Sequence, residues 1–178
     1  MTAGANAAQR RVEPLGRHHD RDAFACGEPA LDLYLKRQAS QDVKRRVAAV
    51  FVLVGDKPET IAGFYTLSAH AMAFGALPAA VAAKLPRYPE IPTLLLGRLA
   101  RDLGFRGQGI GELLLFDALK RALGSSRTVG AFAVVVDAMN EKAAQFYLSY
   151  GFQPVSDRPS RLLLPMATIE RILPQLCG

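Results

Sequence analysis

The amino-acid sequence predicts an α/β (α+β) fold in which helices pack on a mixed sheet. Short apolar or β-branched runs, which predict strands, alternate with segments whose apolar residues recur every three or four positions, which predict helices. Half of the 178 residues are apolar and 21% are charged, so the chain can bury a sizeable core. No repeat or Pro/Gly-rich linker divides it, and we expect one domain over residues 11–178 behind a flexible tail at residues 1–10.

The first part of the chain predicts a helix and a hairpin. Residues 29–46 begin with a proline, which suits the first turn of a helix, and have one apolar side. The residues on that side are Leu31, Tyr34, Leu35, Gln38 and Ala39. The apolar run 47–54 predicts a buried strand, residues 56–59 a turn, and residues 60–69 the returning strand.

The middle of the chain predicts a short helix, a stiff loop, a strand and a longer helix. The short helix covers residues 79–84, and three prolines predict an extended loop over residues 85–92. A strand over residues 93–103 leads to a glycine-rich turn. Residues 112–123 then predict a helix that ends at Gly124.

The last part of the chain predicts a strand, a helix and two closing strands. Residues 128–136 are rich in β-branched side chains, and Asn140 is a good cap for a helix that Gly151 ends. The closing strands cover residues 152–155 and 161–164. The expected order is strand, helix, two antiparallel strands, short helix, strand, helix, strand, helix and two strands.

Charge and cysteine content restrict the classes of partner and site. Lys and Arg exceed Asp and Glu by 22 to 16, a net charge of +6 that favours an anionic partner such as nucleic acid, a phosphate-bearing cofactor or a membrane surface. Cys26 and Cys177 have no metal-ligand spacing and are too few for a disulfide framework, so we expect no metal. Residues 61–83 are uncharged but interrupted by Gly, Pro and polar residues, which argues against a membrane span, and no secretory signal is evident. A cytoplasmic protein is expected.

The turn from Arg106 to Gly111 is the strongest chemical signal in the chain. Its three glycines allow the backbone to curl closely round a ligand, and its amides precede a helix whose dipole favours anions. The pattern therefore predicts a phosphate or pyrophosphate site. It lacks the Gly-Lys-Ser/Thr ending of a P-loop and the spacing of a dinucleotide fingerprint. A glycine-rich turn that only joins a strand to a helix remains the alternative.

Two motifs resemble those of the GNAT acetyltransferase superfamily. The turn matches the Q/R-x-x-G-x-G/A loop of that family. The later stretch Asn140-x-x-Ala143-x-x-Phe146-Tyr147-x-x-x-Gly151-Phe152 matches its second signature. The resemblance implies the GNAT fold, a mixed central sheet of about six to seven strands flanked by about four helices. It also implies that the loop holds the pyrophosphate of acetyl-CoA.

From Phe24 to about Leu164 the chain resembles the tRNA-acetylating toxin branch of toxin–antitoxin systems. The matching segments are Phe24-x-Cys26-Gly27-x-x-x-Leu31-Asp32-x-Tyr34-Leu35, Gly63-Phe64-Tyr65-Thr66-Leu67-Ser68, Leu85-Pro86-Arg87-Tyr88-Pro89-x-Ile91-Pro92 and Leu95-Leu96-Gly97-Arg98-Leu99-Ala100. Two residues depart from the branch. Arg101 stands where an aliphatic residue is commoner, and Arg106 replaces the more usual Gln.

The resemblance implies a set of site residues. Backbone groups of Leu99, Ala100 and Arg101 would hold the pantetheine arm and the thioester carbonyl. The other implied cofactor-binding residues are Arg106, Gly107, Gln108, Gly109, Ile110, Gly111, Asn140 and Phe146. Tyr147 maps to the general acid, because a phenol of pKa near 10 stays protonated at neutral pH and can donate to a thiolate leaving group. Without the family context, Tyr147 is a packed helix aromatic.

The acceptor is predicted from what the chain lacks and from its basic residues. No general base stands out, and His18, His19 and His70 fit structural or solvated roles. An α-amine of pKa about 7.7–8.0 needs a base less than a lysine does, which makes aminoacyl-tRNA a plausible acceptor. The predicted RNA-binding residues are Arg37, Lys44, Arg45, Arg46, Arg87 and Tyr88. Further cations that could meet RNA phosphates cluster in the N-terminal segment, namely Arg10, Arg11, Arg17 and Arg21. A solvated basic face is the alternative.

Three hypotheses follow. The leading one is an acetyl-CoA-dependent N-acetyltransferase that acetylates the α-amine of aminoacyl-tRNA and blocks translation. The resemblance implies a ribbon-helix-helix antitoxin as partner and a homodimer. The alternatives are a GNAT enzyme acting on a small-molecule amine or a protein N-terminus, and a non-catalytic CoA-binding regulatory module.

Overall fold

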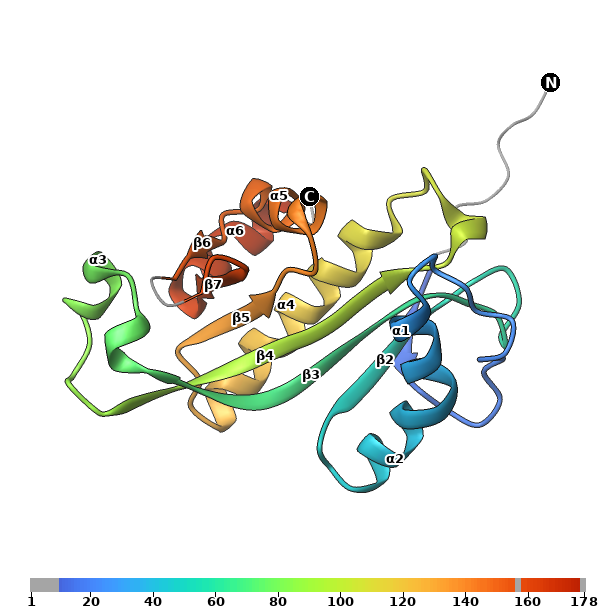
Figure 1. Cartoon of the computed structure of the whole chain (residues 1–178), viewed down its shortest axis with the longest axis horizontal. Helices are drawn as coiled ribbons and strands as arrows, with labels where there is room; N and C mark the ends of the chain where they lie inside the picture. Colours follow the sequence, from blue (N-terminus) through green and yellow to red (C-terminus); the bar gives the residue numbers. More distant parts are fainter. Residues whose placement is uncertain (1–9, 156–157, 177–178) are drawn as a thin grey trace. The chain divides into compact units, whose positions relative to one another are not determined.

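The computed structural model describes residues 10–155 and 158–176, in which seven strands form one mixed sheet (Figure 1). The strand order is β1-β2-β3-β4-β5-β7-β6. β4 pairs with β5 in parallel, whereas the pairs β1–β2, β5–β7 and β6–β7 are antiparallel. The predicted fold class is confirmed. The predicted tail lies outside the described residues except for Arg10, and so does Cys177.

The described chain forms two compact units, one with residues up to Thr66 and Arg98–Leu115, the other with Leu67–Gly97 and the chain from Phe116. Three elements contribute to both units: β3 (Ile61–Ala73), β4 (Glu90–Arg101) and α4 (Ile110–Thr128). The prediction of a single domain over residues 11–178 stays a prediction.

The first unit has a core between its strands and one interrupted helix. Its elements are β1 (Val12–Pro14), α1 (Pro29–Leu33), a π-helical turn (Tyr34–Gln38), α2 (Ala39–Lys44) and β2 (Ala49–Val54), and α2 packs beside β2 (Figure 1). Tyr34, Leu35 and Ala39 are buried with Phe24 and Phe64. The π turn widens the spacing between buried positions. Gln38, predicted on the buried side, is therefore exposed.

The second unit is built on the parallel pair β4–β5 and on β7. Its further elements are a 3₁₀ turn (Phe74–Ala76), α3 (Ala79–Ala82), β5 (Ala133–Asp137), α5 (Glu141–Ser149), β6 (Gln153–Pro154), β7 (Arg161–Pro165) and α6 (Met166–Leu176). Both α5 and α6 pack beside β7 (Figure 1). The core holds Met72, Ile91, Val135 and Leu163. As predicted, α5 begins after Asn140.

Two predicted boundaries around α4 are wrong. The helix continues past Gly124 to Thr128, so Gly124 lies inside it and does not end it. A glycine inside a helix costs only about 1 kcal/mol relative to alanine, which neighbouring packing can exceed. The strand predicted from residue 128 begins at Ala133, because residues up to Thr128 are still helical.

The proline-rich loop is shorter than predicted, since β4 already begins at Glu90. Pro92 has no N–H to donate, but its carbonyl accepts a hydrogen bond from Phe132 N–H at 2.8 Å, so the strand tolerates it. β4 ends at Arg101, before a 3₁₀ turn at Leu103–Phe105. The prediction also missed α6, although its buried Met166, Ile169 and Leu173 have helical spacing.

No helix in the described part of the chain is long and apolar enough to cross a membrane. The uncharged stretch 61–83 folds as β3, the 3₁₀ turn and α3.

Candidate active site

The exit of β4 is fixed by Asp102. Its backbone N–H donates to Ala62 C=O at 2.9 Å. Its carboxylate accepts hydrogen bonds from Ala25 N–H at 3.0 Å and from Gly104 N–H at 2.7 Å. Ala100 is buried in the core of the first unit, whereas Leu99 and Arg101 are half-buried. The strand end that is predicted to bind the cofactor is therefore rigidly placed at the start of the glycine loop.

The glycine loop leaves open space beside its backbone. Gly107 and Gly109 have φ angles of 72° and 70°, which side-chain-bearing residues rarely adopt. A Cβ atom on either would meet nothing within 4 Å. The first helical bond of α4 runs from Leu113 N–H to Gly109 C=O, so the amides of residues 110–112 precede it. These amides and the helix dipole suit a phosphate group.

Gly63 on β3 permits the close approach that positions this loop. A Cβ at Gly63 would lie 2.7 Å from Leu114 Cδ1, 2.8 Å from Ala100 C=O and 3.0 Å from Ile110 Cγ2. Ile110 and Leu114 are buried residues of the first turns of α4. The start of α4 can therefore lie against β3 and β4 only because residue 63 has no side chain.

Arg10 contacts the glycine loop, and the sequence analysis did not predict this contact. Its guanidinium donates to the side chain of Gln108 and lies 5.1 Å from the ring centroid of Phe105. The sequence placed Arg10 among cations for RNA. Arg106 is exposed, and a direct role of Gln108 in cofactor binding stays a prediction.

Helix α5 carries the predicted general acid. Tyr147 is 7% exposed, and its ring packs edge-to-face on Phe146 and Phe152, with both centroid distances 5.3 Å. Burial raises the pKa of the Tyr147 phenol, which is therefore protonated at neutral pH. Asn140 accepts a hydrogen bond from Ala143 N–H at 2.9 Å, so its side-chain oxygen caps α5. Contact of Asn140 and Phe146 with a cofactor remains a prediction.

The predicted RNA-binding residues are exposed in both units. Arg37, Lys44, Arg45 and Arg46 lie on or just after the helix of the first unit, and Arg87 and Tyr88 lie between α3 and β4. Tyr88 is 61% exposed, so its ring is not packed in a core. Their contact with RNA remains a prediction.

Arg46 has a left-handed backbone, with a φ of 58°. It follows the last residues of α2 in a Schellman motif, in which Arg46 N–H donates to Val43 C=O and Val47 N–H donates to Asp42 C=O. Glycine is the usual residue at this position because a side chain there strains the backbone. An arginine is held there at a cost in stability.

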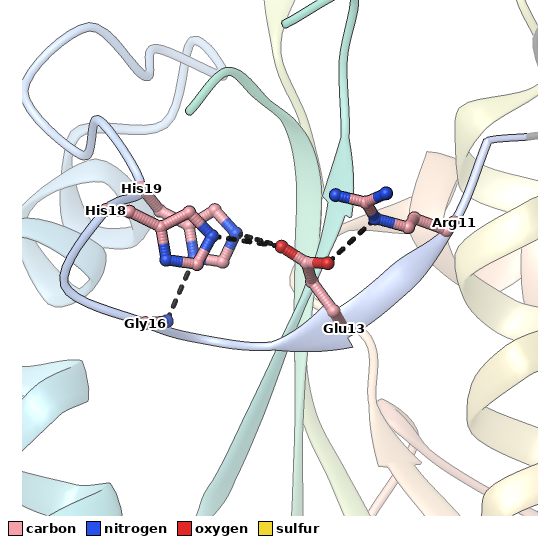
Figure 2. Close-up of polar contacts among 5 residues, drawn as sticks. All are labelled: Arg11, Glu13, Gly16, His18 and His19. Carbon is pink, nitrogen blue, oxygen red and sulfur yellow. Dashed lines mark hydrogen bonds and ion pairs between the residues drawn. The ribbon is translucent and has the colours of Figure 1, made fainter. Parts of the chain in front are cut away.

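A cluster that the sequence missed joins β1 to the segment after it (Figure 2). Glu13, His18 and His19 place their ligand-type atoms within 4.8 Å of one another, a spacing that a metal ion can use. However, His19 Nδ1 accepts from Gly16 N–H at 2.9 Å, so the proton is on Nε2, 2.8 Å from Glu13 Oε1. A metal ligand needs a lone pair there. The geometry therefore describes a hydrogen-bonded clamp, not a metal site.

A family model described as "Acetyltransferase (GNAT) domain" matches residues 47–154, a range that includes the glycine loop and Tyr147. The chain belongs to the GNAT acetyltransferase family. The family predicted from the two motifs is confirmed.

Relatives of this GNAT acetyltransferase include named toxins. The chain is 34% identical over 179 residues to "Probable toxin TacT" of Sinorhizobium fredii, covering 96% of this chain and 99% of the relative. It is 33% identical over 167 residues to a "tRNA-acetylating toxin" of Mycobacterium tuberculosis, covering 94% and 96%.

Two solved structures have the same fold as this GNAT chain. AtaT complexed with acetyl-methionyl-tRNAfMet is 32% identical, with a TM-score of 0.85 and coverage of 92% of this chain and 98% of AtaT. A tyrosine-to-phenylalanine mutant of AtaT bound to the C-terminus of its antitoxin AtaR and acetyl-CoA is also 32% identical, with a TM-score of 0.77 and coverage of 92% and 97%.

Gly63→Ala is expected to lower the free energy of unfolding by about 1–3 kcal/mol, because the new methyl group displaces α4 from the strands. It should also weaken acetyl-CoA binding, measured by calorimetry, because Ile110 carries the loop. Gly75→Ala is the control, since a Cβ there meets nothing within 4 Å. Equal stability and affinity of the two variants would contradict the close-approach argument.

Glu13→Gln tests the clamp. Burial opposes ionisation of Glu13, but hydrogen bonds from His19, His18 and Arg11 outweigh it and lower the pKa from 4.5 to about 2. Because the pKa of Glu13 is lower in the folded state, its ionised carboxylate stabilises the fold at pH values above the unfolded pKa of 4.5. This contribution is lost as the pH falls from 4.5 towards 2. Urea unfolding should show the wild type more stable by about 1–3 kcal/mol at pH 7 and less so at pH 3.

The control for this pH series is Glu59→Gln, which removes an exposed carboxylate. A gap between wild type and Glu13→Gln that is the same at pH 7 and pH 3 would show that Glu13 has an ordinary pKa.

Proposed function

We propose that this GNAT acetyltransferase is a toxin that transfers the acetyl group of acetyl-CoA to the α-amine of an aminoacyl-tRNA and so blocks translation. The observation that carries the proposal is its likeness, along 92% of the chain, to a toxin structure that contains an acetylated tRNA. The open glycine loop at the start of α4 supports the cofactor half of the reaction.

Acetyl-CoA fits the residues of the first unit. The amides of the glycine loop would bind its pyrophosphate, with Arg106 and Gln108 at the rim and Gly107, Gly109 and Gly111 allowing close approach. The free space beside Gly107 and Gly109 is the kind of cradle that this requires. The backbone of Leu99–Arg101 would hold the pantetheine arm and polarise the thioester carbonyl. When bound, acetyl-CoA supplies the activated acetyl group.

Tyr147 would donate its phenolic hydrogen to the departing thiolate. Its raised pKa keeps the proton on the phenolic oxygen until the sulfur of the departing CoA becomes basic. A thiolate that leaves into the same water-poor surroundings also has a raised pKa, so the match between donor and acceptor is preserved.

The acceptor would be bound by charge and would need little help to lose its proton. An α-amine of pKa about 8 is partly neutral at pH 7, so a water molecule suffices as base. The exposed cations after α2 and beside Tyr88 would contact RNA phosphates, which makes binding sensitive to salt.

The proposed partner is an antitoxin of the ribbon-helix-helix type, and the proposed assembly of the toxin is a homodimer. The solved complex of AtaT with the C-terminus of AtaR supports a protein antitoxin. Co-expression followed by affinity capture tests the antitoxin, and measurement of mass in solution tests the homodimer. A cytoplasmic location beside aminoacyl-tRNA is also proposed, and cell fractionation tests it.

Transfer of labelled acetyl groups tests the function. With aminoacylated tRNA the wild type should incorporate label, and with deacylated tRNA it should not. Tyr147→Phe should lower the rate about 10²–10⁴-fold, because the thiolate leaves without a proton donor. Tyr150→Phe, at the residue that follows α5, is the matched control and should keep the wild-type rate.

The outcomes separate the competing functions. Label on a small amine or a protein N-terminus, with none on charged tRNA, would replace the acceptor proposed here. Binding of acetyl-CoA with no transfer to any amine would favour a CoA-binding regulatory module.

Arg46→Gly tests the RNA-binding role of the strained residue. The free energy of unfolding should rise by up to about 1 kcal/mol because glycine relieves the left-handed backbone. Affinity for tRNA should fall several-fold, with a shallower salt dependence, because one phosphate contact is lost. Arg46→Lys, which keeps both charge and strain, should keep wild-type affinity. Equal affinity of all three proteins would remove Arg46 from the RNA interface.

A further inference from the structure

Arg101 has a buried atom that the rest of the described chain does not satisfy. Its Nε is the one buried side-chain nitrogen or oxygen, among the described residues, that lacks a hydrogen-bond partner. A buried polar group of a charged side chain is costly when unpaired, and such groups are normally completed by an ion, water or ligand. The position of Arg101, at the last residue of β4 and just before the glycine loop, suggests what completes it.

Among the described residues, Arg101 forms no ion pair with the neighbouring Asp102. Both oxygens of the Asp102 carboxylate accept hydrogen bonds from backbone amides, those of Ala25 and Gly104. Ala100 points into the core of the first unit, and side chains alternate along a strand, so Arg101 leaves β4 on the other face. The Arg101 side chain is therefore half-buried, and its guanidinium has no counterion among the described residues.

An aliphatic side chain at the end of β4 would pack without a polar requirement, whereas Arg101 introduces one. A planar guanidinium with five N–H donors matches the oxygens of a phosphate in a two-pronged contact. Arg101 thus adds an anion-binding group to a strand end whose backbone is proposed to hold the pantetheine arm.

We propose that Arg101 binds a phosphate group of a substrate and so determines substrate affinity in this chain. The proposal rests on the proposed function, under which two substrates carry phosphates: acetyl-CoA and the 3′ end of an aminoacyl-tRNA. The chemistry of the contact is the same for both, and direct binding measurements separate them.

Two variants, Arg101→Val and Arg101→Lys, are compared with the wild type. Affinity for acetyl-CoA is measured by calorimetry and affinity for labelled tRNA by fluorescence anisotropy, neither of which needs turnover. We expect at least one of the two dissociation constants to rise about tenfold or more in Arg101→Val. The dissociation constant of Arg101→Lys should lie between those of the wild type and Arg101→Val, because lysine keeps the charge but cannot make the two-pronged contact. Arg127→Val is the control, an exposed arginine paired with Glu170.

A second readout separates this role from a structural one. Removing an unsatisfied guanidinium should leave the melting temperature of the unliganded protein unchanged or higher in Arg101→Val. The gain in melting temperature on adding the affected substrate should shrink. A purely structural arginine would give the opposite result, a lower melting temperature without ligand.

The assignment is overturned if both dissociation constants of Arg101→Val and Arg101→Lys stay within twofold of the wild type. A wild type that binds acetyl-CoA but acetylates no aminoacyl-tRNA would refute the proposed function and leave the calorimetric test of Arg101 intact.

Discussion

The geometry of the candidate site depends on how the chain turns from β4 into α4. Asp102 uses its backbone and both carboxylate oxygens to fix this turn, and its partners Ala62, Ala25 and Gly104 come from three separate segments. A carboxylate that accepts hydrogen bonds from two backbone amides is a stiff anchor, because each bond limits the others. The amides at the start of α4 can then face a ligand without reorganising, which is the condition for strong anion binding.

The same turn shows why some of the site was visible in the sequence and some was not. The loop from Arg106 to Gly111 and the cap at Asn140 were predicted because their signals are local: glycines that need a positive φ, and an amide side chain that can accept from the third residue on. The bond from Arg10 to Gln108 joins residues 98 positions apart, and the bond from Ala25 to Asp102 joins residues 77 apart. No local pattern encodes such pairs.

The fold shows the same division. Periodicity located the long helices and most strands, but their ends depend on tertiary packing. Gly124 has the character of a helix terminator and yet lies inside α4, and Pro92 has that of a loop residue and yet lies inside β4. The close approach at Gly63 could not be predicted either, because the sequence does not show which glycines lie where a side chain has no room. Strain at Arg46 likewise shows only in the backbone angles.

The π turn at Tyr34–Gln38 gives the first helix one residue more than a regular helix would need at this point. Each residue of an α-helix corresponds to a rotation of about 100°. Deleting a single residue inside the π turn would let a regular helix form, and the later positions would keep nearly the same direction. The same deletion inside α2 would rotate every later position, and the basic residues that follow α2 would face a new direction. The length of the first helix can therefore change at the π turn without turning the charged surface that follows it.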